Sequence, residues 1–258
     1  MEPGAGPCEP PGDSSDRPGS RALTVSIRNR LLAALSPEDL ERLAPHLEPV
    51  PFKRGQVLHS ANRPLGSVHF VEAGLVSVLT EPERGHIMEV WLVGCEGLTG
   101  IPALLGGERS YHRHVALTRG EALRIDASEL RKAMLERPSL AAPLLRFVEV
   151  ILVQTARVGA CNARHSLGER LARWLLMARD RAVSDDLPLT HDMLSQLLGV
   201  RRAGVTEGIN RLEREGFVRN ERGRIIILDL DGLKAASCGC YDAVYAAYER
   251  ILGGPKAE

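Results

Sequence analysis

The hydrophobic positions of the chain change their period at about residues 51 and 126. Between these points, short runs rich in β-branched residues alternate with polar ones and are separated by glycines. The runs cover residues 57–58, 67–71, 75–79, 87–93, 113–117 and 122–125. Such alternation is typical of half-buried strands, and short strands at even spacing indicate an antiparallel roll or sandwich.

Helical spacing precedes and follows this region. Ser36 has the character of an N-cap, with Pro37 at the first helical position and Asp39 at the third, so two short helices are expected before the strands. Residues 139–162 form a single predicted helix of about six turns. Seven of its residues step by 4 and 3, as in a coiled-coil seam: Leu140, Leu144, Phe147, Ile151, Gln154, Val158 and Cys161.

A second apolar stripe lies beside this seam on the same helix. It consists of Leu145, Val148, Leu152 and Thr155. One stripe can pack on the strands while the other meets a partner, which predicts a homodimer. The alternative is a helix buried wholly within its own chain.

Residues 165–228 have the order of a winged helix-turn-helix. An amphipathic helix is followed by a second helix that Thr190 caps and Gly199 ends, then by a third helix that stops at Gly216, and then by a hairpin. The third helix is expected to direct its polar face at DNA. The predicted DNA-binding residues are Thr190, Arg201, Arg202, Ala203, Thr206, Glu207 and Asn210.

The distribution of charge along the chain is compatible with DNA binding. The 258 residues have 33 basic and 33 acidic side chains, yet residues 163–228 hold 12 arginines, no lysine and 9 acidic residues, a net of +3. Arginine binds phosphate and guanine edges through two points, although an ordinary solvated face would carry the same charge. We expect no membrane segment and no signal peptide, and five scattered cysteines indicate a reducing cytoplasm. The absence of catalytic motifs predicts that the chain is not an enzyme.

The predicted fold is therefore α+β, in five segments. These are a disordered tail (residues 1–22), a β-roll sensor domain (23–137), a dimerisation helix (138–162), a winged helix-turn-helix domain (163–229) and a C-terminal helical extension (230–258).

This order of elements resembles the bacterial Crp/Fnr-type transcription regulators over about residues 30–230. The most specific stretches are LSQLLGV (194–200) and VTEGINRLEREGFV (205–218), and residues 55–79 resemble the opening of the family's β-roll, with Gly55 and Gly74 in its turns. The resemblance implies a homodimer on double-stranded DNA, with the half-sites of a two-fold operator about 34 Å apart. We also expect a signal relayed from the roll through the dimerisation helix to the recognition helices, and RNA polymerase as a partner.

The chain departs from the family where cyclic nucleotide would bind. Relatives that bind it have Gly-Glu-Leu and then Arg-Ser or Arg-Thr, whereas this chain has Gly100-Ile101-Pro102 and therefore lacks the acid for the ribose. An Arg-Ser pair remains and is followed by Tyr-His. The candidate effector residues are Gly100, Arg109, Ser110 and Tyr111, and the effector itself is not identified.

No metal site or cofactor is predicted. The chain lacks the N-terminal cysteine group of the iron–sulfur relatives. Cys161, Cys238 and Cys240 are interpreted as packing or surface cysteines rather than redox groups, and His112 with His114 is a weak metal pair without a third ligand.

The recognition helix also departs from the family pattern. Arg202 keeps its place, Ala203 cannot accept a hydrogen bond from cytosine, and Glu207 either reads cytosine or orients Arg211. A rival hypothesis is a small-molecule-binding signalling module whose winged helix contacts protein rather than DNA.

Overall fold

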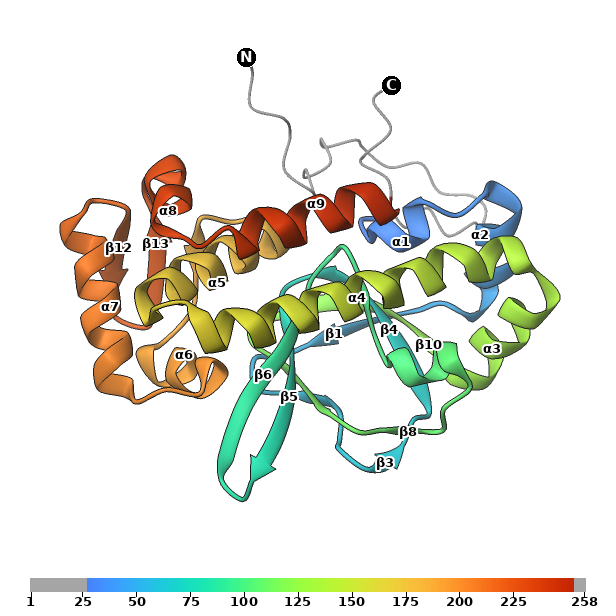
Figure 1. The fold of residues 1–258 in the computed structure, drawn as a ribbon. Helices are drawn as coiled ribbons and strands as arrows, with labels where there is room; N and C mark the ends of the chain where they lie inside the picture. Colours follow the sequence, from blue (N-terminus) through green and yellow to red (C-terminus); the bar gives the residue numbers. More distant parts are fainter. Residues whose placement is uncertain (1–26, 253–258) are drawn as a thin grey trace, which may run out of the picture.

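The structure is a computed structural model that describes residues 27–252. The predicted tail, residues 1–22, lies outside the described part of the chain. A strand-rich half is followed by helices and a small separate sheet, and one long helix runs along both halves (Figure 1). The predicted α+β fold is confirmed.

Two four-stranded antiparallel sheets form the β-roll. The first has the order β1 (Glu48–Phe52), β10 (Gly120–Asp126), β4 (Ser67–Ala73) and β7 (Leu98–Thr99). The second has the order β2 (Val57–His59), β9 (Arg113–Ala116), β5 (Val76–Glu83) and β6 (His86–Val93). A short pair, β3 (Arg63–Pro64) with β8 (Arg109–Ser110), lies beside them. The six predicted runs correspond to β2, β4, β5, β6, β9 and β10.

Strand β1 was not predicted, and its composition explains why. Pro49 and Pro51 cannot donate backbone hydrogen bonds, so they argue against a central strand. β1 is the edge strand of its sheet and pairs only with β10, where Pro49 faces Leu123. An edge strand tolerates proline because one side of its backbone needs no partner strand.

Short helices close one end of the roll. The N-terminal elements are α1 (Arg30–Ala33), α2 (Pro37–Leu43) and a 3₁₀ turn, η1 (Ala44–His46). Ser36 accepts a hydrogen bond of 3.1 Å from the backbone N–H of Asp39, as its predicted N-cap role requires. A second 3₁₀ turn, η2 (Ile101–Leu105), follows β7, and α3 (Ala127–Glu136) follows β10.

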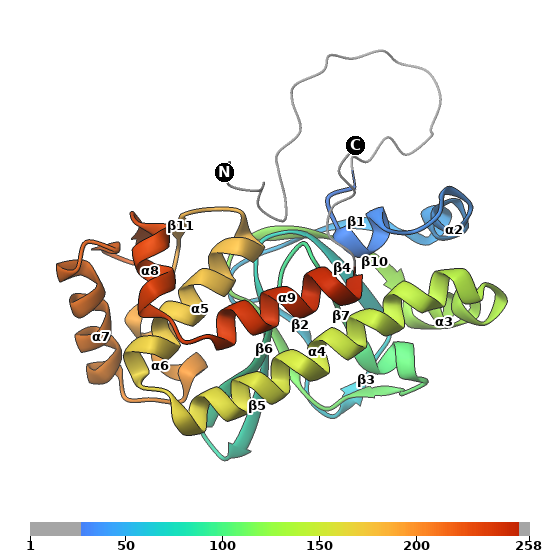
Figure 2. The ribbon, with the colours of Figure 1, turned by 45° about the horizontal axis from the view of Figure 1, so that its top comes forward.

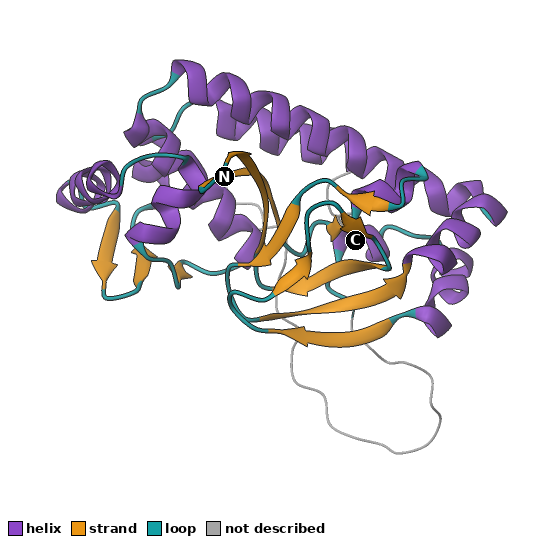
Figure 3. Cartoon of the chain, turned by 90° about the horizontal axis from the view of Figure 1, so that it is seen from below, coloured by secondary structure: helices purple, strands orange, loops and turns teal. Residues whose placement is uncertain are grey.

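Helix α4 (Pro138–Arg164) crosses the roll and leads into the C-terminal half. That half contains α5 (Leu167–Ala182), α6 (His191–Leu198), α7 (Arg202–Arg214), α8 (Leu230–Ala236) and α9 (Cys240–Leu252). A small sheet has the order β11 (Asp186–Leu187), β13 (Arg224–Ile227) and β12 (Val218–Glu221). Figure 3 shows the strands of the roll gathered on one side of α4 and separate from this small sheet. Helix α9 runs alongside α4 (Figures 1 and 2).

Helix α4 bears on the expectation that the chain has no membrane segment. Within residues 27–252 it is the one helix long and apolar enough, by length and composition alone, to cross a membrane, a test that the core helix of a soluble protein also passes. Helix α4 is this apolar because it has two apolar faces. One face packs against the roll and α9, and the other is exposed.

Candidate nucleic-acid interface

The framework of the interface is a pair of helices joined by a tight turn. The side chain of Thr190 accepts a hydrogen bond of 3.2 Å from the backbone N–H of Met193 and so begins α6. Gly199 ends α6 in the left-handed conformation, with φ of 63°. Val205 and Ile209 are fully buried under α7. The turn between α6 and α7 thus fixes the direction of α7.

Two glycines allow α7 to approach α5 closely. A Cβ atom on Gly204 would lie 2.9 Å from the Leu167 side chain, and one on Gly208 would lie 2.5 Å from Leu171. Both distances are shorter than van der Waals contact, so a larger residue at either position would require the leucine side chain or the helix to shift. The sequence analysis did not identify this contact, although the two glycines are one helical turn apart.

The opposite face and the start of α7 carry the predicted DNA-binding residues except Thr190, which is the N-cap of α6. Arg201, Arg202, Ala203, Glu207 and Asn210 are exposed, and Thr206 is partly buried. All of these except Arg201 line one hollow on the surface, together with Glu213 and Arg214. Arg201 is the N-cap of α7, and its side chain does not cap the helix. The start of α7 therefore offers backbone N–H groups and the exposed side chains of Arg201 and Arg202, which suit phosphate and base edges.

Hydrogen bonds connect α7 to the hairpin that follows it. The His191 ring bridges the Thr206 hydroxyl, at 3.0 Å, and the Asn220 side chain, at 3.2 Å. Glu213 accepts a hydrogen bond of 2.8 Å from the backbone N–H of Asn220. The sequence analysis missed His191, and nothing in its local pattern marks it. Arg211 pairs with Glu215 at 3.0 Å, so the interpretation that Glu207 orients it is wrong.

The candidate effector residues are divided between the inside and the outside of the roll. Gly100 has a φ of 90°, and a Cβ there would lie 3.5 Å from the His59 ring. Ser110 is buried and donates a hydrogen bond of 2.7 Å to the backbone oxygen of His112. Arg109 is exposed, and Tyr111 is 74% exposed. The structure therefore brings Gly100 and Ser110 to the interior and leaves the other two on the surface.

Three buried histidines occupy this interior. The His59 ring centre lies 5.1 Å from that of His69 and 4.8 Å from that of His114. Thr99 binds His59 at 2.9 Å. Burial, with the neighbouring His69, lowers the pKa of His59 to about 3, and burial with the nearby Arg124 lowers that of His69 to about 4. Burial also holds the pKa of His114 well below its usual range. At neutral pH the interior is thus a set of uncharged imidazoles.

The predicted dimer seam lies against the chain itself. Of its residues, only Val158 is partly exposed, and the other six are buried: Leu140, Leu144, Phe147, Ile151, Gln154 and Cys161. Phe147 fills the space that a side chain on Gly97 of the roll would need. Further along the helix, Gln154 meets Tyr248 of α9 at 3.0 Å. The predicted helical spacing is correct, but these side chains pack on the roll and the C-terminal extension, so they are not available to a partner.

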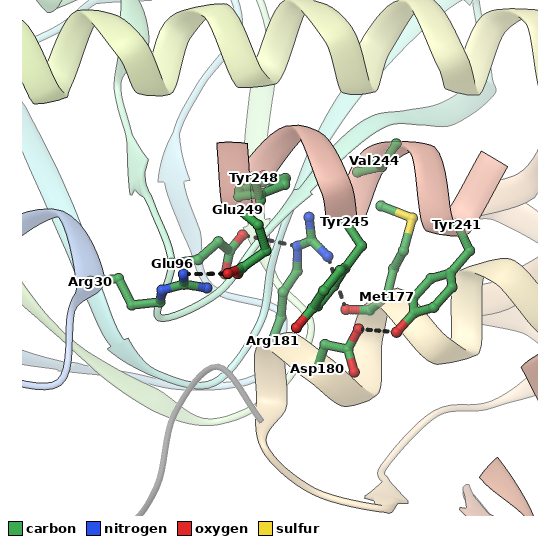
Figure 4. A pocket seen from close by; sticks show the side chains of 10 residues that line it. All are labelled: Arg30, Glu96, Met177, Asp180, Arg181, Tyr241, Val244, Tyr245, Tyr248 and Glu249. Carbon is green, nitrogen blue, oxygen red and sulfur yellow. Dashed lines mark hydrogen bonds and ion pairs between the residues drawn. The ribbon is translucent and has the colours of Figure 1, made fainter. Parts of the chain in front are cut away.

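The C-terminal extension is held by a buried polar network (Figure 4). Arg181 of α5 forms an ion pair of 2.9 Å with Glu96 of the roll and donates a hydrogen bond of 3.0 Å to Gln154. Tyr241 donates a hydrogen bond of 2.7 Å to Asp180. The cavity between these side chains has a volume of about 30 Å³, enough for a water but not for an organic ligand. The network therefore joins the extension to the body of the protein.

Comparison with known proteins agrees with this arrangement. Residues 49–137 match the model of a cyclic nucleotide-binding domain, and residues 169–236 match that of a Crp-like helix-turn-helix domain. The chain is 31% identical to the transcriptional regulator SdrP of Thermus thermophilus, over 72% of this chain and 93% of that protein. It is 26% identical to the global nitrogen regulator of Synechococcus elongatus, over 69% and 84%. The structure of FixK2 from Bradyrhizobium japonicum superposes with a TM-score of 0.65 at 17% identity, covering 74% of this chain and 98% of that one. The chain belongs to the Crp/Fnr family of DNA-binding transcription regulators.

Proposed function

We propose that the chain acts in the cytoplasm as a homodimer that binds a two-fold DNA operator, with RNA polymerase as a further partner. It acts as a regulator rather than an enzyme. The observation that carries the proposal is the exposed polar face of α7, which begins with Arg201 and Arg202 and is braced by α5 from behind. A helix supported in this way fits the major groove of DNA.

The dimer forms through the second face of α4. The residues of this face are all exposed and step by 3 and 4: Ala142, Leu145, Glu149, Leu152, Ala156, Gly159 and Ala163. Leu145 is 43% exposed and Leu152 is 67% exposed. A 3–4 repeat is the spacing of a coiled coil, and the small residues at its C-terminal end let two helices approach closely. Both leucines belong to the second stripe predicted from the sequence, whereas Val148 of that stripe is buried and Thr155 is partly buried.

A signal enters at the β-roll and reaches the recognition helix through direct contacts. Met88 of β6 lies against the turn between α6 and α7, 3.2 Å from where a Cβ on Gly199 would be. Effector binding near Gly100 and Ser110 moves the strands, and with them this turn. The signal can favour one arrangement only through its different affinity for the two states.

Replacing Arg202 with Ala tests the DNA contact. With an operator selected by the protein from random duplexes, the R202A variant is expected to lose about 1–3 kcal/mol of binding free energy, as for one bidentate base contact. Arg84→Ala is the matched control, because it removes an equal charge from an exposed site on the roll hairpin. A loss below about 0.5 kcal/mol in R202A would contradict the proposed role of this residue.

Salt dependence separates DNA binding from the rival hypothesis. Each phosphate neutralised by the protein contributes about −0.9 to the slope of log affinity against log salt concentration. We expect a steep slope, smaller by about 1 when one phosphate contact is removed. An interaction insensitive to salt would instead favour a winged helix that contacts protein.

A further inference from the structure

Three cysteines and one histidine meet where the long helix ends and the C-terminal extension begins. Cys161 is in the last turn of α4, His165 is the residue that ends this helix, and Cys240 is the first residue of α9. Cys238 lies in the link between α8 and α9. The four ligand atoms, three Sγ and one imidazole nitrogen, all lie within 4.8 Å of one another.

The distances match the edges of a metal tetrahedron. Zn–S bonds of about 2.3 Å and Zn–N bonds of about 2.0–2.1 Å place neighbouring ligand atoms of a tetrahedral site about 3.6–3.8 Å apart. The Sγ atoms of Cys161 and Cys238 are 3.4 Å apart, and Sγ of Cys240 is 3.7 Å from Nδ1 of His165. A small inward or outward movement of these side chains would therefore place all four around one ion.

The backbone already holds the ligands in place. The backbone N–H of His165 donates a hydrogen bond of 3.0 Å to the carbonyl of Cys161, which fixes these two residues on successive turns. The N–H of Tyr241 donates one of 3.1 Å to the carbonyl of Cys238. The three thiols are buried and His165 is partly buried. Binding would therefore require little ordering of the chain.

A buried guanidinium group supplies the matching charge. An ion of charge +2 with three thiolates and one neutral imidazole has a net charge of −1. Arg173 is 2% exposed, and its Nε has no hydrogen-bond partner among the described residues. Its Nη1 reaches the sulfur of Met177, at 3.1 Å. Its charge acts on the thiols of Cys161 and Cys240, and also on the buried Glu89.

From this arrangement we infer that Cys161, His165, Cys238 and Cys240 bind one thiophilic divalent cation, with Zn²⁺ as the best match. A closed set of three sulfurs and one nitrogen is typical of structural rather than catalytic zinc. The ion displaces three thiol protons to solvent and bonds to the unprotonated Nδ1 of the imidazole. It fastens the α8–α9 link to the joint between α4 and the DNA-binding domain. The inference does not depend on the proposed dimer or operator.

Metal analysis of the full-length protein, purified with reduced thiols, tests the inference first. We expect about one bound Zn²⁺ per chain, and after exchange with Co²⁺ the visible spectrum of a tetrahedral thiolate site. Thermal unfolding should occur at a higher temperature with the ion than after chelation. Protein that is folded and reduced but takes up neither ion would overturn the inference. So would a Cys161–Cys238 disulfide, detected by mass spectrometry, in place of the metal.

Variants identify the ligands. Cys240→Ser should bind Zn²⁺ more than tenfold more weakly, because even outer-shell partners of a metal cost about 10–100-fold. Ser237→Ala is the matched control next to the site and should retain full stoichiometry. His165→Cys should keep the ion, with a Co²⁺ spectrum of four sulfurs, whereas His165→Gln should lose it. Full zinc binding by folded Cys240→Ser and His165→Gln would contradict the assignment of these ligands.

Discussion

The indole N–H of Trp174 donates a hydrogen bond of 2.7 Å to the carboxylate of Glu89 and so joins α5 of the DNA-binding domain to β6 of the roll. Glu89 also accepts a hydrogen bond of 2.5 Å from Ser77 of β5. Burial raises the pKa of Glu89, against the effect of both hydrogen bonds. The carboxylate is thus shared between the β-roll and the DNA-binding domain.

Trp174→Phe should destabilise the protein by about 1–3 kcal/mol, because it leaves a buried carboxylate without one of its donors. The free energy of unfolding in urea measures this. Trp91→Phe is the matched control, since the Trp91 indole nitrogen has no hydrogen-bond partner among the described residues. Equal losses in the two variants would show that the hydrogen bond to Glu89 contributes nothing.

Acid should destabilise the roll through its histidines. His59 and His69 have a pKa of about 3 and about 4 in the folded chain, against about 6.5 when unfolded. Between these values the unfolded state binds more protons, so the free energy of unfolding decreases as the pH falls below about 6.5. Glu72 and Glu89, whose pKa values burial raises, have the opposite effect.

The difference between wild type and His59→Gln isolates the histidine contribution. Urea unfolding at pH values from about 7 to about 4 should show a shallower loss of stability in the variant. His86→Gln, at an exposed site, is the control and should follow the wild type. Identical pH profiles for wild type and His59→Gln would contradict a role of the buried ring in acid sensitivity.

Replacing a glycine at the contact between α5 and α7 with a larger residue should lower both the free energy of unfolding and the affinity for the operator. Gly208→Ala places a methyl group 2.5 Å from the end of the Leu171 side chain, and overpacking of this kind costs about 1–3 kcal/mol, of which the higher helix propensity of alanine offsets up to about 1 kcal/mol. Gly168→Ala, where nothing lies within 4 Å, should instead stabilise α5 by up to about 1 kcal/mol. Denaturation and operator affinity of both variants give the comparison. An unchanged free energy of unfolding in Gly208→Ala would mean that the Leu171 side chain moves aside without an energetic cost.

A charge on the exposed face of α4 should prevent dimerisation. Leu152→Arg places a guanidinium group in the centre of the proposed interface, so sedimentation equilibrium should find monomers at micromolar concentration. Leu135→Arg is the control, because Leu135 is 86% exposed on α3 and lies away from this face. A dimer that survives Leu152→Arg would exclude the proposed stripe as its interface.

The sequence predicts the local elements well where side chains alone determine them. Ser36 and Thr190 are found as the N-caps that the sequence predicted, and Gly199 ends its helix as expected. Each of these features depends on two to four neighbouring residues. Their physical causes are therefore all present in a short stretch of sequence.

Contacts between residues far apart in the sequence could not be predicted in the same way. Both faces of α4 have coiled-coil spacing, and nothing in that spacing says that α9 returns to cover Gln154 and Cys161. The four candidate metal ligands show the same limit. In the sequence they form two separate weak pairs, Cys161 with His165 and Cys238 with Cys240. The four come together because α9 folds back on the end of α4.

The Gln154 side chain accepts hydrogen bonds from both Arg181 of α5 and Tyr248 of α9, each at 3.0 Å. Through this one amide oxygen, the long helix is hydrogen-bonded to two other helices at once. A turn of α4 by a single residue, about 100°, would carry that oxygen away from both donors together. A rotation of the long helix would therefore break its hydrogen bonds to the DNA-binding domain and to the C-terminal extension in the same step.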